Sequence, residues 1–88
     1  MTAEPSAASA ESGDGEHSYL QQLGARVRDA RTRPGLSRKA LAGKSGVSER
    51  YLAQLEGGQG NISILLLRQV AAALDCPLTE LLGERDSQ

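Results

Sequence analysis

The chain has 88 residues, which is the size of one small domain and excludes a multidomain enzyme. Alanine and leucine supply 25 residues, whereas valine, isoleucine and aromatic residues are scarce, so we expect an all-α domain. A single cysteine and a single histidine predict neither an internal disulfide nor a metal site, and no run of residues is apolar enough to span a membrane. We therefore expect a cytoplasmic protein with no cofactor in this domain.

The charges are unevenly distributed along the chain, although the formal net charge is only −1. Residues 1–18 contain four acids and no lysine or arginine. Residues 19–60 contain eight basic residues and three acids, which gives a formal charge of +5. Such a basic block is typical of a protein that contacts phosphate, although a solvated helix face has a similar composition.

Residues 1–18 are predicted to be a disordered acidic tail. Alanine, serine, glycine and glutamate make up 13 of these residues, so the tail cannot bury enough apolar surface to offset the entropy lost on ordering. A tail of this composition increases solubility, and an autoinhibitory imitation of nucleic acid is the alternative role.

Five helices are predicted over residues 19–83. The first covers residues 19–33, where apolar side chains recur every three or four positions, and it stops at Pro34-Gly35. Serine residues suited to capping helix N-termini precede the next three helices, and Pro77 opens the fifth, which Gly83 ends. The capping serines are Ser37, Ser48 and Ser63, and their helices end by Gly46, at Glu56 and near Leu74.

Residues 38–56, with the sequence RKALAGKSGVSERYLAQLE, have the spacing of a DNA-binding helix-turn-helix. Two helices joined by so short a link approach closely, which requires small residues such as Ala42 at their contact and Gly46 in the turn. The apolar residues that face the shared core are Leu41, Val47, Leu52 and Leu55. An ordinary helical hairpin that does not touch DNA is the alternative.

Residues 19–83 resemble the compact five-helix, lambda-repressor-like domain of the Cro and phage-repressor family, also called XRE-type. The resemblance implies that the helix over 49–56 enters the major groove and that Arg31 forms a salt bridge with Glu56. The pairing also has a physical reason, because an acid at the negative C-terminal end of a helix is unfavourable unless a cation compensates it.

A narrower resemblance lies in SERYLAQLEGGQGNISILLLRQVAAAL, which is similar to the DNA-binding domain of benzoyl-CoA-responsive repressors of aromatic catabolism. This resemblance implies a repressor whose effector, benzoyl-CoA, binds a shikimate-kinase-like domain that follows a linker. Residues 84–88 are then a C-terminal linker or end, and the effector domain is expected to be missing.

The first exposed positions of the helix over 49–56 are candidates for reading base edges. Arg50 suits guanine, Gln54 suits adenine, and Ala53 suits the thymine methyl group. Glu49 either accepts a hydrogen bond from cytosine or only stabilises the first turn of the helix.

Polar residues around these helices are candidates for phosphate contacts: Ser37, Arg38, Lys44, Ser48, Tyr51, Asn61 and Ser63. Alternatively, Tyr51 is partly buried and only packs against the core. Arg26 and Arg28, in the first helix, are expected to face water.

The helix after Ser63 carries more apolar residues than one core needs. The expected core positions are Ile64, Leu67, Val70, Ala71 and Leu74. Leu65 and Leu66 stand where polar residues are common in the family, so we expect them to contact a second subunit or the missing domain, with looser packing as the alternative. Asp75 stands where glycine often ends this helix, which predicts a small local strain.

These features predict a sequence-specific DNA-binding domain of a bacterial transcriptional regulator, and not an enzyme. Gly43-Lys44-Ser45 matches only the end of a phosphate-binding loop, because position 38 is not glycine. Two copies, as a homodimer, are expected to bind half-sites about one helical turn apart on a double-stranded operator. The second hypothesis is a protein-interaction module, such as an antitoxin or coactivator-like domain.

Overall fold

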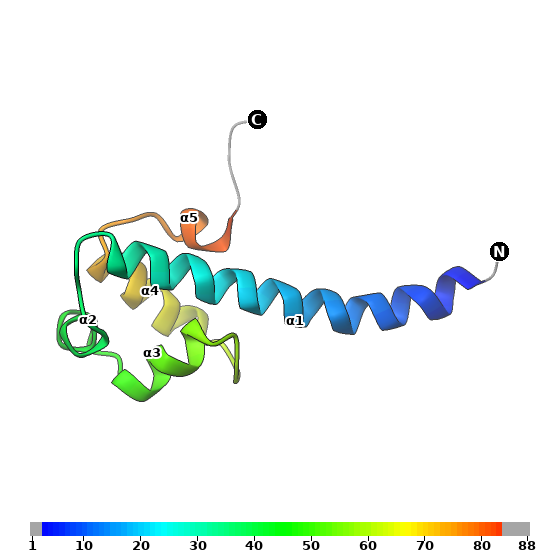
Figure 1. The fold of residues 1–88 in the computed structure, drawn as a ribbon, viewed down its shortest axis with the longest axis horizontal. Coiled ribbons are helices and arrows are strands. Elements are labelled where there is room, and N and C mark those ends of the chain that lie inside the picture. Colours follow the sequence, from blue (N-terminus) through cyan, green and yellow to red (C-terminus); the bar gives the residue numbers. More distant parts are fainter. Residues whose placement is uncertain (1–2, 84–88) are drawn as a thin grey trace.

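The computed structural model describes residues 3–83, and every regular element in this range is a helix (Figure 1). The elements in chain order are α1 (Ala3–Thr32), α2 (Arg38–Ser45), α3 (Glu49–Glu56), α4 (Ile64–Ala73) and α5 (Leu78–Leu82). The predicted all-α fold with five helices is therefore confirmed.

The longest helix, α1, runs alongside the shorter helices (Figure 1). It packs against α3 and α5, while α2 contacts α3 and α4, and α4 contacts α5. The N-terminal half of α1 extends beyond this bundle, so only its C-terminal half lies beside the shorter helices (Figure 1).

Helix α1 begins earlier than the first helix predicted from the sequence. In the structure residues 3–18 are helical and continue into the rest of α1, so this helix begins at Ala3 and not at Tyr19. Pro5 lies in the first turn of α1, where its missing N–H is tolerated. The predicted linker, 84–88, and residues 1–2 lie outside the described residues.

The core lies between α1 and the shorter helices. It contains all four apolar residues predicted to lie under the helix-turn-helix, together with the inward-facing residues of α1, α4 and α5. The buried apolar residues are Leu23, Val27, Leu41, Val47, Leu52, Leu55, Leu67, Val70, Ala71 and Leu81.

One expectation for α4 is wrong, because Ile64, expected in the core, is 54% exposed. Leu66 is half-buried and packs against the core, which agrees with the alternative of packing within the domain. Leu66 lies four residues before the buried Val70, so helical periodicity places both on the inward face, whereas Ile64 is the first residue of the helix. Leu65 is 65% exposed, so the outward apolar surface consists of Ile64 and Leu65.

The predicted serine caps are confirmed. The Oγ atoms of Ser37, Ser48 and Ser63 accept hydrogen bonds from backbone N–H groups in the first turns of α2, α3 and α4, at 3.0, 3.0 and 3.3 Å. Each serine therefore satisfies one donor that the helix itself leaves without a partner.

Left-handed residues follow several helices, among them the predicted helix-ending residues Gly46 and Gly83. Gly46 has φ 76° after α2, and its N–H donates to the carbonyl oxygen of Ala42 at 2.9 Å. Asp75, after α4, has φ 58°, which is rare for a residue with a side chain. The local strain predicted at Asp75 agrees with this conformation.

Gly24 is expected to be essential for the contact between α1 and α3. A Cβ atom at position 24 would lie 2.5 Å from the carbonyl oxygens of Leu55 and Glu56, which are backbone atoms. We expect Gly24→Ala to lower the free energy of unfolding in urea by about 1–3 kcal/mol.

Gly43→Ala in α2 is the matched control for this prediction. A Cβ atom at position 43 would meet no other atom within 4 Å, so alanine is expected to raise the free energy of unfolding by roughly 0.5–1 kcal/mol. Equal free energies of unfolding for the two variants would contradict the close approach of α1 and α3.

Candidate nucleic-acid interface

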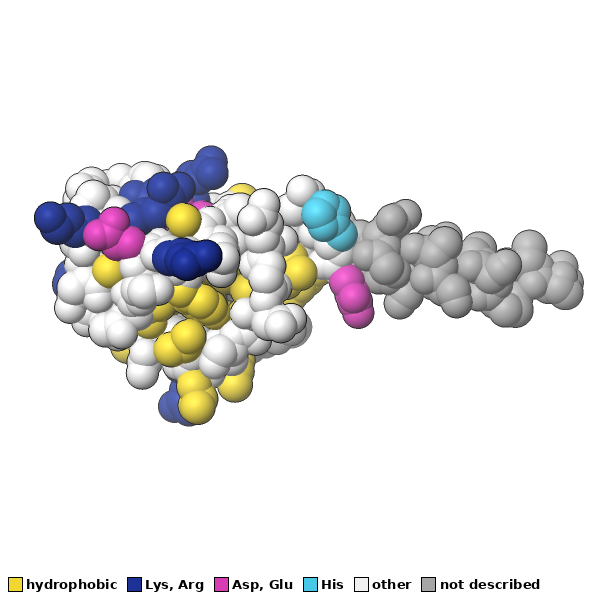
Figure 2. Space-filling model, turned by 90° about the horizontal axis from the view of Figure 1, so that it is seen from below, with side chains coloured by type: hydrophobic (Ala, Val, Ile, Leu, Met, Phe, Trp, Pro, Cys, Tyr) yellow, Lys and Arg dark blue, Asp and Glu magenta, His cyan; other side chains and the backbone are white. Residues whose placement is uncertain are grey.

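α3 has one buried face and one exposed face. Leu52 and Leu55 are fully inside, whereas the predicted base-reading residues all point outward: Glu49, Arg50, Ala53 and Gln54 are exposed. Figure 2 views the molecule from the side on which α3 lies, and Lys and Arg side chains gather there, away from the extension of α1. The structure thus brings the four predicted residues together on one surface.

The residues predicted to contact phosphate differ in their exposure. Ser37, Lys44, Ser48 and Asn61 are exposed, whereas Arg38, Tyr51 and Ser63 are half-buried. The capping hydroxyl groups of the serines accept hydrogen bonds, and each keeps its own hydrogen for donation to another acceptor.

Tyr51 and Ser63 contact each other. The backbone N–H of Ser63 donates to the hydroxyl oxygen of Tyr51 at 3.2 Å, which fixes the start of α4 to α3. Tyr51 also packs against the hydrophobic core. It is therefore partly buried, which is the alternative to a phosphate contact. Its hydroxyl hydrogen remains available to an outside acceptor.

Arg31 and Glu56 form the predicted salt bridge, and it is buried. The Nε atom of Arg31 donates to Oε2 of Glu56 at 2.6 Å, and Nη2 donates to Oε1 at 2.9 Å. The third nitrogen, Nη1, donates to the carbonyl oxygen of Leu36 at 2.8 Å. One guanidinium group therefore joins α1, the end of α3 and the segment that leads into α2.

Two more arginines lie beside the same carboxylate. The Nε atom of Arg38 donates to Oε1 of Glu56 at 3.0 Å, and the Nε atom of Arg28 lies 3.9 Å from that oxygen. Arg28 is exposed, as expected, but it belongs to this cluster. Arg28 and Arg31 are three residues apart, and this spacing indicates that both lie on the same side of α1. The approach of Arg38 to Glu56, by contrast, depends on the tertiary fold.

The cluster determines the charge of Glu56. Burial alone raises the pKa of this carboxyl group, but the hydrogen bonds and charges of Arg31 and Arg38 outweigh it and hold the pKa below its ordinary value. The hydrogen bond to Glu56 in turn raises the pKa of Arg31, against the opposing effect of burial. Both partners of the buried salt bridge are therefore charged at neutral pH.

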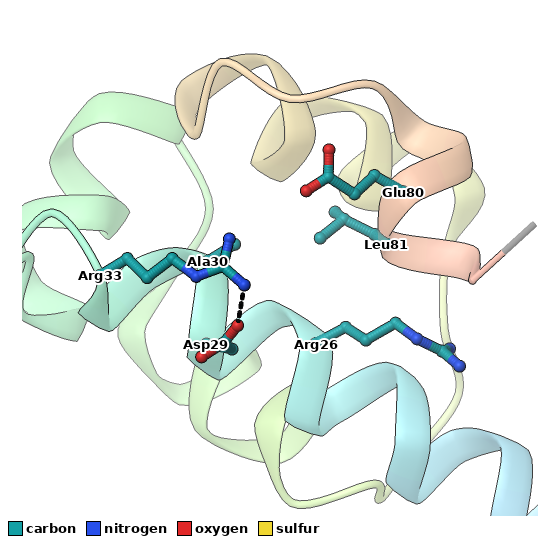
Figure 3. Close-up of a pocket in the computed structure, with 6 residues that line it drawn as sticks. All are labelled: Arg26, Asp29, Ala30, Arg33, Glu80 and Leu81. Atoms are coloured by element: carbon teal, nitrogen blue, oxygen red, sulfur yellow. Dashed lines mark hydrogen bonds and ion pairs between the residues drawn. The ribbon is translucent and has the colours of Figure 1, made fainter. Parts of the chain in front are cut away.

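A pocket of about 190 Å³ lies elsewhere, between α1 and α5 (Figure 3). Arg33 donates to Asp29 at 2.6 Å on one side of it, and Glu80 lies on the other. Arg26 lines the pocket with its stem and, contrary to expectation, is half-buried, with one terminal nitrogen buried and unpartnered among the described residues. None of the predicted base-reading or phosphate residues lines this pocket.

Within residues 3–83, no helix combines the length and the apolar character needed to cross a membrane. The same part of the chain contains no group of three or more histidine, cysteine, aspartate or glutamate residues placed to hold a metal ion.

The short link between α2 and α3, with the exposed polar face of α3, defines a helix-turn-helix domain. Residues 27–81 match the family HTH_3, described as helix-turn-helix, and the chain belongs to this family.

Relatives in this family are regulators of transcription. The chain is 40% identical over 65 residues to the HTH-type transcriptional regulator SinR of Bacillus licheniformis, covering 73% of the chain and 59% of SinR. It is 43% identical over 60 residues to the HTH-type transcriptional regulator SlrR of Bacillus subtilis (strain 168), covering 67% of the chain and 40% of SlrR. The chain thus spans less than two thirds of each relative's length. These relatives are not enzymes, in agreement with the prediction.

The fold is similar to those of solved structures. The restriction-modification controller protein C.AhdI from Aeromonas hydrophila has a TM-score of 0.68 and 40% sequence identity, with 70% of this chain and 94% of that chain covered. An HTH_3 family transcriptional regulator from Vibrio cholerae has a TM-score of 0.72 and 26% identity, with 77% and 38% covered. The XRE-type helix-turn-helix fold expected from the sequence is therefore confirmed.

Acid is expected to weaken the domain through Glu56. Because the pKa of Glu56 is lower in the folded than in the unfolded chain, its contribution is complete above the unfolded-state pKa of about 4.3 and is lost as pH falls through the folded-state value. In urea unfolding at neutral pH we expect Glu56→Gln to cost about 3–5 kcal/mol, and its stability to depend less on pH in acid than that of the wild type.

Asp29→Asn is the control, because Asp29 forms an exposed ion pair with Arg33. This variant is expected to change the free energy of unfolding by at most about 1 kcal/mol. If the wild type and Glu56→Gln lost stability in parallel on acidification, Glu56 would not be the group responsible.

Proposed function

We propose that the chain is the sequence-specific DNA-binding domain of a bacterial transcriptional regulator, acting in the cytoplasm. The observation that carries this proposal is the outward face of α3, on which four exposed side chains suited to base edges stand together. An α-helix fits the major groove of B-DNA, where each base pair presents a distinct pattern of donors and acceptors. The relatives SinR and SlrR are named as transcriptional regulators, which supports the same function.

In the proposed complex α3 lies in the major groove. Arg50 donates to guanine, Gln54 pairs with adenine, Ala53 packs on a thymine methyl group, and Glu49 faces the groove from the first helical turn. Exposed polar residues beside α3 contact phosphates and fix the position of the helix without selecting bases.

Selection of bound sites from a random duplex pool, followed by substitution of Arg50 and Gln54, tests this function. Arg50→Ala and Gln54→Ala are each expected to cost about 1–3 kcal/mol of binding free energy on the selected duplex, and to relax base choice at one position. Lys44→Ala is the control, since loss of a phosphate contact weakens all duplexes alike.

Recovery of no common site from the pool would contradict sequence-specific binding. Binding to an acidic protein instead of DNA would favour the protein-interaction module. Equal losses for all three variants on selected and random duplexes would show that the base-reading residues are assigned wrongly.

We further propose that two copies bind one operator as a homodimer, and that the exposed apolar surface of α4 contributes to their contact. Ile64 and Leu65 are the exposed large aliphatic residues among those described, and an isologous contact would place the same surface on both subunits.

Leu65→Glu is expected to weaken self-association, measured by analytical ultracentrifugation, and to leave the free energy of unfolding within about 0.5 kcal/mol of the wild type. Leu66→Glu, by contrast, is expected to destabilise the fold, because Leu66 packs against the core. If Leu65→Glu left both association and operator binding unchanged, this surface would have no role in dimerisation.

The narrower proposal is a repressor of aromatic catabolism with benzoyl-CoA as the effector of a further domain. Its only support is the resemblance of residues 48–74 to benzoyl-CoA-responsive repressors. The names of SinR and SlrR mention neither aromatic catabolism nor benzoyl-CoA. Selected binding sites located upstream of genes for degrading aromatic compounds would support it, and selected sites elsewhere in the genome would contradict it.

A further inference from the structure

We propose that Arg28 and Arg38 together bind one phosphate of the DNA backbone, and that Glu56 is the positioning residue for both guanidinium groups. This inference rests on the proposed function and adds a contact from α1, a helix outside the helix-turn-helix. The sequence alone predicts only that Arg28 faces water.

The two arginines converge on one atom from different helices. The Nε atom of Arg38, at the start of α2, lies 3.0 Å from Oε1 of Glu56, and the Nε atom of Arg28, in α1, lies 3.9 Å from the same oxygen. The bidentate bond to Arg31 already uses both carboxylate oxygens. Three guanidinium groups thus share one negative charge, and two positive charges remain without an anionic partner in the cluster.

Arg28 and Arg38 are open to an outside ligand, in contrast to Arg31. Their side chains are 58% and 41% exposed, whereas that of Arg31 is 10% exposed. Arg38 uses its Nε atom for Glu56, and within the described residues its terminal nitrogens form no hydrogen bond. A guanidinium group is a planar fork of donors that matches the oxygens of a phosphate, and a second anion between two arginines also relieves their mutual repulsion.

The position of the cluster favours a phosphate of DNA. It lies where α1, the start of α2 and the end of α3 meet, so it borders the helix proposed to enter the major groove. When a recognition helix occupies the groove, the elements beside it face the phosphate backbone. Ser37, the exposed N-cap of α2, is the residue next to Arg38 and supplies a further hydroxyl donor.

Arg28→Ala tests the proposal, with Arg33→Ala as the matched control. Both are exposed arginines of the same region of α1, but Arg33 pairs with Asp29 beside α5. Affinity is measured by fluorescence anisotropy on the selected duplex and on a random duplex over a series of salt concentrations. We expect Arg28→Ala to lose roughly tenfold in affinity on both duplexes at low salt, and its slope of log affinity against log salt to be shallower by about 0.9.

Duplexes that carry a single neutral methylphosphonate locate the contact. The wild type is expected to lose affinity when one particular phosphate is neutralised. Arg28→Ala is expected to lose less at that position, because only Arg38 still contacts this phosphate, and a merely structural role for Arg28 would leave the two losses equal.

Several outcomes contradict the inference. If Arg28→Ala binds both duplexes with the affinity of the wild type, or with the same affinity and salt slope as Arg33→Ala, the inference is wrong and the proposed function still stands. A wild-type chain that binds no duplex overturns both. Unfolding in urea shows whether both variants are folded, and Arg28→Lys, which keeps the charge without the fork, is expected to retain the salt slope with weaker affinity.

Discussion

The buried salt bridge between Arg31 and Glu56 is the interaction on which the candidate DNA-binding surface depends. α3 has only eight residues, and a helix of that length is not stable in water without tertiary contacts. Its leucines attach one face to the core, and the bidentate pair fixes its C-terminal end to α1 and to the segment before α2. Breaking the pair would leave a buried charge at the end of the helix whose outward residues face the proposed groove.

The contact between α1 and α3 explains why arginine and glycine share one stripe of α1. Gly24, Arg28 and Arg31 recur at four- and three-residue intervals, which places them on the same side of the helix. Gly24 permits close approach to the end of α3, and the arginines then reach the carboxylate of Glu56. The close packing of α1 on α3 and the ion pairs with Glu56 thus depend on the same side of α1. Arg28, the exposed arginine on this side, borders the surface proposed to contact DNA.

Local sequence signals predict most of the helix boundaries and the exposed face of α3. Serine caps, glycine at helix ends and apolar periodicity act over a few residues, so they are readable without the fold. The shared contacts of Arg38 and the outward position of Ile64 depend on how helices pack, and sequence reasoning misses them. Sequence reasoning also places the start of the first helix at Tyr19, whereas α1 begins at Ala3.

The central claim is that α3 contacts base edges. Backbone amide shifts of the labelled chain, measured during titration with the selected duplex and with a scrambled duplex of equal length, test it most directly. The account predicts that residues 49–54 change with the selected duplex and much less with the scrambled one, whereas residues at the start of α2 respond to both. Unchanged shifts over 49–54 in a saturated complex would contradict it.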